Sequence, residues 1–219
     1  MKIWHISDTH GKHAGLQVPS DVDIIIHSGD FSHSKSSAVN CAELESFIEW
    51  YSSLPVKNKV LIAGNHDVSL GRSLYPVSDI LSKGIFYLES SSVIIDGIKI
   101  WGSPYSPSFG DGWSFNKSRG SIGLLWDNIP ADVDVLVTHG PPKTILDFNS
   151  ELEPVGCASL YKKVVNLSSL KAHCFGHVHN NRKITNTGLR ILYDVIYSNG
   201  SVISDGSREL TGNGNLFRI

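Results

Sequence analysis

Side chains suited to binding metal ions recur at five places along the chain. They are Asp8, His10, Asp30, Asn65, His139, His177 and His179. Carboxylates, imidazoles and an amide oxygen suit Mn, Fe or Zn, and seven such ligands are too many for one tetrahedral ion. Two ions that share a bridging carboxylate would use the whole set, and paired ions are a common device of phosphoryl chemistry. The residue types therefore predict a two-metal site that acts on phosphate.

Each of these clusters directly follows a short apolar run. The runs are Lys2–Ile6, Val22–His27, Lys59–Ala63, Val133–Val137 and Ala172–Phe175. Such runs, bounded by Gly, Ser or Asn, are typical of buried strands. In layered α/β folds the carboxyl ends of strands converge on a crevice that binds ligands, so we expect the clusters to meet there. If the last strand continues, His177 and His179 point to the same side of it.

The remaining pattern indicates helices between strands. Apolar residues at three- and four-residue spacing predict a helix over Ala38–Leu54, which ends before Pro55. Shorter helices are expected at Pro76–Lys83, Ser121–Asn128 and Ala158–Leu167, and strands at Ile85–Glu89, Val93–Asp96 and Ile98–Trp101, the last two joined by a hairpin turn at Asp96-Gly97. Residues 103–120 read as a long loop, and residues 190–219 as β-rich without a motif. We expect one α/β domain over residues 1–219, with helices outside stacked sheets.

Composition narrows the class of partner. The chain has 219 residues, a formal net charge of −2 and 18% charged residues, which gives no electrostatic reason for tight nucleic-acid or membrane binding. A single nucleotide or a small phosphate ester would still fit. Three cysteines without a CxxC pair, no signal peptide and no long apolar stretch lead us to expect a cytoplasmic protein. No sequence signal indicates an oligomeric state.

The order of the motifs resembles the calcineurin-like metallophosphoesterase superfamily. That pattern is D-x-H, G-D, G-N-H-[DE], a lone H and G-H-x-H, and every element occurs in order between residues 8 and 179. More narrowly, the chain looks like the metallophosphoesterase-domain (MPPED-like) phosphodiesterases up to about residue 180. The supporting runs are Ser7–Gly11, Ile100–Pro104, Phe115-Asn116 with Arg119-Gly120, Thr138–Pro142 and Phe175–His177. The resemblance implies a four-layer αββα sandwich of the metallo-dependent phosphatase type.

The resemblance also implies a role for each motif residue. One metal would be held by Asp8, His10, Asp30 and His179, and the other by Asp30, Asn65, His139 and His177, so that Asp30 bridges them. A hydroxide bridging both ions would be the nucleophile, and His66 would protonate the leaving alkoxide. Asp67 would orient His66, as carboxylates often orient catalytic imidazoles. We expect two divalent ions, with Mn as first choice and Fe, Zn, Ni or Mg as alternatives.

Further residues could contact substrate. His13 and His33 follow the first two clusters, and Asn116 and Arg119 lie in the long loop, where an arginine would suit a phosphate oxygen. Aromatic residues between Trp101 and Phe115 either stack on a base or pack in the protein. His5, His27 and His173 lie inside apolar runs and are expected to be core residues.

Three functions remain in competition on sequence alone. The first is a phosphodiesterase that hydrolyses small diesters, such as cyclic nucleotides or nucleic-acid-derived diesters. A phosphomonoesterase is less favoured, because Phe31-Ser32-His33-Ser34 follows Asp30 where the superfamily's protein phosphatases carry an arginine that clamps phosphate. A non-catalytic metal-binding scaffold would be expected to lose ligands or the histidine of the G-N-H motif, and this chain keeps both.

Overall fold

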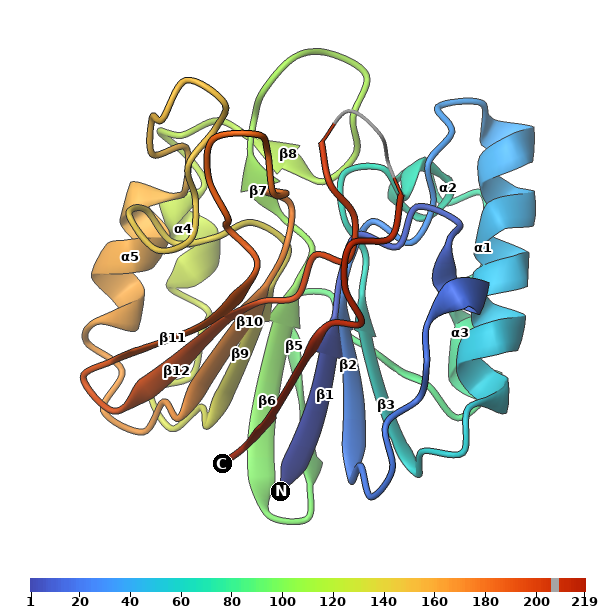
Figure 1. Cartoon of the computed structure of the whole chain (residues 1–219), viewed down its shortest axis with the longest axis horizontal. Coiled ribbons are helices and arrows are strands. Elements are labelled where there is room, and N and C mark those ends of the chain that lie inside the picture. Colours follow the sequence, from blue (N-terminus) through green and yellow to red (C-terminus); the bar gives the residue numbers. More distant parts are fainter. Residues whose placement is uncertain (206–208) are drawn as a thin grey trace.

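Two β-sheets lie face to face in the computed structural model, which describes residues 1–205 and 209–219 (Figure 1). The first sheet has the order β13-β1-β2-β3-β4, with bounds Asn215–Arg218, Lys2–Ile6, Ile24–Ser28, Asn58–Ile62 and Phe86–Tyr87. The second has the order β11-β12-β10-β9-β6-β5, with bounds Gly188–Leu192, Val195–Asn199, Ala172–Phe175, Val135–Thr138, Ile98–Ser103 and Ser91–Ile95. Short strands β7 (Ser106–Pro107) and β8 (Asn116–Lys117) form a separate pair.

Helices cover the outer faces of both sheets. α1 (Ser37–Ser53) and α3 (Val77–Ser82) lie on the first sheet, and α2 (Val68–Gly71) contacts α1. α4 (Gly123–Trp126) and α5 (Ala158–Val164) lie on the second sheet, and a short 3-10 helix, η1, spans His13–Gly15. This arrangement confirms the four-layer αββα sandwich.

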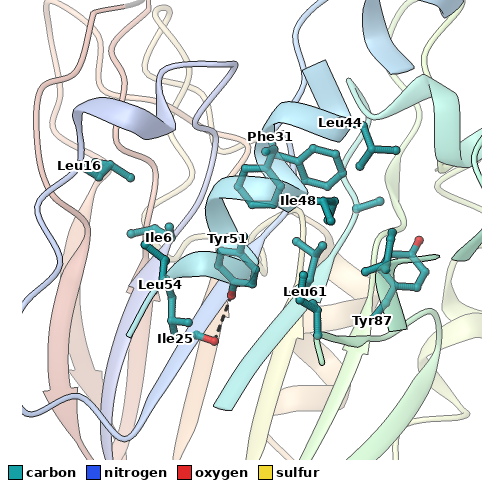
Figure 2. Close-up of a cluster of buried hydrophobic side chains, with 14 of the residues drawn as sticks. Ile6, Leu16, Ile25, Phe31, Leu44, Ile48, Tyr51, Leu54, Leu61 and Tyr87 are labelled. Atoms are coloured by element: carbon teal, nitrogen blue, oxygen red, sulfur yellow. Dashed lines mark hydrogen bonds between the residues drawn. The ribbon is translucent and has the colours of Figure 1, made fainter. Parts of the chain in front are cut away.

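Three apolar clusters fill the three interfaces between these layers, because the central strands are buried on both faces. In β2, Ile25 faces the helices, whereas Ile24 and Ile26 face the other sheet. Tyr51 of α1 packs in the outer cluster, and its hydroxyl donates to the carbonyl of Ile25 at 3.1 Å (Figure 2). Because successive side chains of a strand point to opposite faces, one sheet contributes to two apolar cores.

The parallel arrangement of the central strands delivers the site loops to one edge. β1 pairs in parallel with β2 and β2 with β3, while β9 pairs in parallel with both β6 and β10. Their carboxyl ends therefore lie at the same end of the sandwich, opposite the chain termini (Figure 1). The strands predicted before the five polar clusters are all present.

Other predictions were confirmed in outline. α1 matches the long predicted helix, and the β5–β6 hairpin turns at Asp96 and Gly97, whose φ angles are 50° and 80°. His5, His27 and His173 are fully buried, as expected for core residues. The 103–120 segment contains β7 and β8 rather than loop alone. Within residues 1–205 and 209–219, no helix combines the length and apolar character needed to cross a membrane.

Candidate metal centre

The first group of ligand atoms comes from Asp8, His10 and His179, which lie close enough together to hold one ion. His179 Nε2 lies 3.2 Å from Asp8 Oδ1. His10 Nδ1 lies 2.9 Å from the carbonyl oxygen of Ser32, so Nδ1 carries the proton and Nε2 carries a lone pair. That lone pair faces the centre of the site, as a metal ligand requires.

The second group comes from Asp30, His139 and His177, joined by Asn65. His139 Nδ1 donates to the carbonyl of Ser28 at 2.9 Å, which leaves the lone pair on Nε2. That Nε2 atom lies 2.8 Å from Asn65 Oδ1 and 3.1 Å from His177 Nδ1. Acceptor atoms that converge in this way fit a divalent cation, with the ligand spacing expected at bond lengths of about 2 Å.

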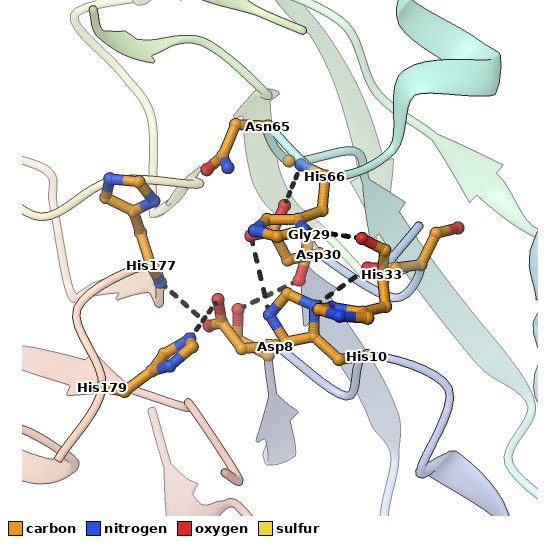
Figure 3. A network of polar contacts seen from close by, with 12 residues as sticks. Asp8, His10, Gly29, Asp30, His33, Asn65, His66, His177 and His179 are labelled. Carbon is orange, nitrogen blue, oxygen red and sulfur yellow. Dashed lines mark hydrogen bonds and ion pairs between the residues drawn. The ribbon is translucent and has the colours of Figure 1, made fainter. Parts of the chain in front are cut away.

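Asp30 lies between the two groups. Its Oδ1 accepts the backbone N–H of His66 at 2.7 Å. Its Oδ2 lies 3.8 Å from His10 Nε2 and 3.4 Å from His139 Nε2, so it faces one histidine of each group. In Figure 3, His177 and His179 lie to the left of Asp8, and His10, His33 and His66 lie to its right, on the side of Asp30. A carboxylate in this position would be shared by one ion in each group.

Backbone strain sets the direction of several of these side chains. Asp8, His10, Asp30 and His177 have φ angles of 54°, 41°, 59° and 68°, in the left-handed region that L-residues rarely adopt. β10 ends at Phe175, as the predicted run does, so His177 and His179 do not lie in a continuing strand. The two histidines reach the centre from a strained turn instead.

Three of the ligands, Asp30, Asn65 and His177, follow a glycine because the chains pass too closely there for a side chain. A Cβ atom on Gly64 would lie 2.3 Å from Asp30 Oδ1, and one on Gly176 would lie 2.1 Å from Asp8 Oδ2. Both glycines therefore let the backbone approach a carboxylate of the site.

The electrostatics of the centre favour positive charge. Burial opposes ionisation of Asp8 and Asp30, but neighbouring histidines hold both pKa values below the usual range. Burial also opposes protonation of His139 and His179, yet Asp30 raises the pKa of His139 to about 9, and Asp205 with Asp8 raises the pKa of His179 to about 10. A buried set of carboxylates that draws positive charge into both groups fits a pair of divalent ions.

Asp67 does not orient the His66 ring, so that prediction is corrected. Its Oδ2 accepts the backbone N–H groups of Asp30 at 2.9 Å and Gly64 at 2.7 Å, and its Oδ1 accepts that of Ser32 at 2.9 Å. Three backbone donors occupy the carboxylate because its loop lies directly against the loop after β2. Asp67 thus joins the two loops that carry Asp30 and Asn65.

His66 lies at the edge of the centre, with its ring centroid 4.5 Å from that of His10. Its Nδ1 donates to the carbonyl of His33 at 3.0 Å, so Nε2 is the nitrogen available to other groups. His66 lines a hollow of about 240 Å³ together with His10, His33 and His179. His33, which the sequence offers as a candidate substrate contact, also lines this hollow.

A larger hollow of about 410 Å³ opens on the other side of the centre. Its lining includes His177 and His179, the aromatic ring of Phe109, and Arg119. The guanidinium of Arg119 donates to the carbonyls of Gly156 and Val155 at 3.0 and 2.7 Å. Arg119 thus lines this hollow, and part of its guanidinium is already bound to the backbone of Val155 and Gly156.

Two residues predicted to contact substrate lie elsewhere. His13 is buried against Phe47 and Trp50, with ring centroids 5.5 and 5.2 Å away, because its 3-10 helix packs on α1. Asn116 lines a separate hollow beside Tyr105, and its Oδ1 accepts the hydroxyl of Ser106 at 3.2 Å. Both predictions are corrected.

Two residues that support the site were missed. Asp205 lies 3.1 Å from His179 Nδ1 and comes from a segment in which we recognised no motif. Asn40 of α1 is buried, donates to the carbonyl of His66 at 2.8 Å and accepts the N–H of Ser69 at 2.8 Å. A polar residue one turn before Leu44 on the buried face of the helix was the available signal for Asn40.

Comparisons with known proteins agree with this geometry. The family model of the calcineurin-like phosphoesterases matches residues 1–181. Human metallophosphoesterase domain-containing protein 1 is 34% identical over 200 residues, which cover 80% of this chain and 59% of that protein. A UPF0046 protein of Caenorhabditis elegans is 35% identical over 206 residues, which cover 84% of this chain and 70% of that protein. The chain thus spans about three fifths of its human relative.

A solved structure shows the same fold at low sequence identity. Phosphopantetheinyl hydrolase of Mycobacterium tuberculosis superposes with a TM-score of 0.57 at 14% identity, over 92% of this chain and 89% of that one.

Proposed function

Because this chain belongs to the calcineurin-like phosphoesterase family, we propose that it is a metal-dependent phosphodiesterase for small diesters, such as cyclic nucleotides or nucleic-acid-derived diesters. The observation that carries the diester assignment is the pair of hollows on either side of the metal centre. One, of about 240 Å³, is lined by His10, His33 and His66, and the other, of about 410 Å³, by Phe109 and His177. His179 and Asp205 border both hollows.

Two hollows suit a phosphodiester better than a monoester. A diester carries an organic group on each side of phosphorus, whereas a monoester carries one. In an in-line displacement the leaving group departs opposite the nucleophile. The hollow beside His66 would then take the leaving alcohol, and the larger hollow beside Phe109 would take the group retained on the product.

The residues of the centre have separable roles in this proposal. The ions would be held by Asp8, His10, Asp30, Asn65, His139, His177 and His179. When bound, two such ions supply a hydroxide at neutral pH and neutralise phosphate oxygens. His66 donates a proton from Nε2 to the leaving oxygen, because Nδ1 is held by the carbonyl of His33. Asp30 would be the ligand shared by the two ions, and Asp67 keeps the loop of Asp30 in place.

The test compares a bis-aryl phosphate diester with the matching aryl phosphate monoester. Metal-stripped protein is assayed alone and after addition of Mn²⁺, Fe²⁺, Zn²⁺, Ni²⁺ or Mg²⁺, and Mn²⁺ is expected to restore the most activity. We expect faster turnover of the diester, and no turnover without metal. Faster turnover of the monoester would reassign the protein as a phosphomonoesterase. Metal binding without turnover of either ester would favour the scaffold.

A further inference from the structure

The segment between β7 and β8 is fastened over the metal centre at several points. Ser106 N donates to the carbonyl of Phe115 at 3.0 Å, and Ser114 N donates to the carbonyl of Asn65 at 3.1 Å. Lys35 Nζ donates to the carbonyl of Asp111 at 3.2 Å. The segment is thus tied both to a residue of the metal centre and to the chain before α1.

The segment also packs tightly against α2. A Cβ atom on Gly71 would lie 2.4 Å from Ser114 Oγ, so the backbone of α2 meets Ser114 at van der Waals distance. Only glycine permits this approach without a shift of one of the two segments. The backbone of the neighbouring residue, Trp113, is therefore held in place, and this limits the positions that its side chain can adopt.

Trp113 lies directly against His66. Their ring centroids are 4.1 Å apart, with the planes inclined by 43°. Lys35 Nζ lies 3.8 Å from the centroid of the Trp113 ring, a cation–π distance. Both rings are only partly buried, so the contact forms at the surface of the site rather than in the core.

Three other contacts complete the surroundings of the His66 ring. His10 meets it edge-on at 4.5 Å, His33 is stacked at 5.5 Å, and the carbonyl of His33 accepts from Nδ1. A single hydrogen bond leaves an imidazole able to pivot about that bond. Rings packed against the imidazole limit this freedom, and the ring of Trp113 lies nearer to it, at 4.1 Å, than those of His10 and His33.

We infer that Trp113 is the positioning residue for His66, in the role that the sequence had suggested for Asp67. Trp113 touches neither phosphate nor metal in this inference; it acts through His66. The ring keeps Nε2 directed at the leaving oxygen, and Lys35 holds the ring in turn. The inference rests on the proposed function, because it assigns His66 the proton transfer to the leaving group.

Leaving-group dependence separates positioning from a general structural effect. A nitrophenolate departs without a proton, whereas the more basic phenolate gains from one. Loss of His66 positioning should slow diphenyl phosphate far more than bis(4-nitrophenyl) phosphate, two substrates of similar shape. Misplacing a catalytic group by about 1 Å can lower the rate about 100-fold.

The experiment measures kcat for both esters in wild type and Trp113→Ala with Mn²⁺ bound. We expect Trp113→Ala to lower kcat for diphenyl phosphate at least about tenfold, with a change of less than about threefold for the nitrophenyl ester. Trp113→Phe should recover most of the loss, because a ring remains against His66. The kcat of Lys35→Met for diphenyl phosphate should lie between those of Trp113→Ala and wild type. The control is Tyr193→Ala, which removes an exposed ring from the distant turn between β11 and β12.

A second measurement does not depend on turnover. The Cε1 proton of His66, assigned by its disappearance in His66→Ala, should move in the NMR spectrum of metal-free Trp113→Ala because the ring current of Trp113 is lost. An unmoved resonance, or equal loss of kcat on both esters, would overturn the inference. Wild-type protein inactive on both esters would instead overturn the proposed phosphodiesterase function, and the NMR result would still decide whether Trp113 holds the His66 ring.

Discussion

The carboxylate of Asp205 lies 3.1 Å from His179 Nδ1, while Nε2 of the same ring lies 3.2 Å from Asp8 Oδ1. A carboxylate behind a ligating histidine fixes its tautomer and strengthens it as a donor. Asp205 lies beyond the region matched by the family model, which ends at residue 181. The C-terminal segment therefore contributes to the metal centre and does not merely complete the sheets.

Removing the charge of Asp205 should weaken metal binding. Asp205→Asn is expected to lower the affinity for Mn²⁺ about 10- to 100-fold, the range seen when such supporting carboxylates are lost. Titration calorimetry of metal-free protein measures this directly. The matched control is Asp194→Asn, an exposed aspartate in the β11–β12 turn. If both variants bind Mn²⁺ like wild type, Asp205 has no supporting role.

Metal binding by both groups of ligands should depend on Asp30, whereas His179 should matter only for the first group. Asp30 Oδ2 faces both His10 and His139, so Asp30→Asn should weaken the binding of both ions. His179→Ala affects only the first group and should leave one ion bound. Equilibrium dialysis with elemental analysis is expected to give two Mn²⁺ per wild-type chain, about one for His179→Ala and fewer than one for Asp30→Asn. Two ions retained by Asp30→Asn would contradict a shared carboxylate.

Acid should destabilise the fold through its buried core histidines. Burial lowers the pKa of His173 to about 3, below the unfolded value of about 6.5, and His5 and His27 behave alike. Between these values the unfolded chain binds more protons than the folded one, so stability is intact above pH 6.5 and is lost as pH falls towards 3. Each such histidine lowers the free energy of unfolding by about 2 kcal/mol between pH 7 and pH 5.

The variant His173→Gln removes one of these titrating histidines and so measures its contribution. His173 Nε2 lies 2.8 Å from Thr138 Oγ1, and His173→Gln keeps a polar end without a titrating ring. Urea unfolding of metal-free protein at pH 7 and pH 5 should show a smaller loss of stability in this variant, by about 2 kcal/mol. An identical loss in both proteins would mean that His173 does not stay neutral in the fold.

The strands and the convergence of their loops could be predicted because they follow from short-range signals. Strands such as β2, Ile24–Ser28, are buried on both faces, and parallel neighbours bring their carboxyl ends to one edge. The ligand types and their order then indicated the centre.

What could not be predicted depends on contacts between segments distant in sequence. The adjacency of Asp67 and His66 suggested an orienting pair. However, the Asp67 carboxylate accepts backbone N–H groups of the loop after β2, and His66 Nδ1 donates to the carbonyl of His33. Asp205 carries no local signal, because its importance arises only when the C-terminal segment crosses the site. Backbone angles such as the φ of 68° at His177 are likewise fixed by tertiary contacts.

Asp67 should therefore behave as a structural tie and not as a catalytic partner of His66. Asp67→Asn replaces one acceptor oxygen by an amide and leaves a buried backbone N–H of Asp30, Gly64 or Ser32 without an acceptor. We expect a loss of about 3 kcal/mol in the free energy of unfolding, measured in urea, against no change for the exposed Asp127→Asn. Mn²⁺ affinity should fall as well, because the loop of Asp30 is released. The ratio of kcat values for the phenyl and nitrophenyl esters should remain that of wild type, in contrast to Trp113→Ala. A ratio that falls as it does in Trp113→Ala would return the orienting role to Asp67.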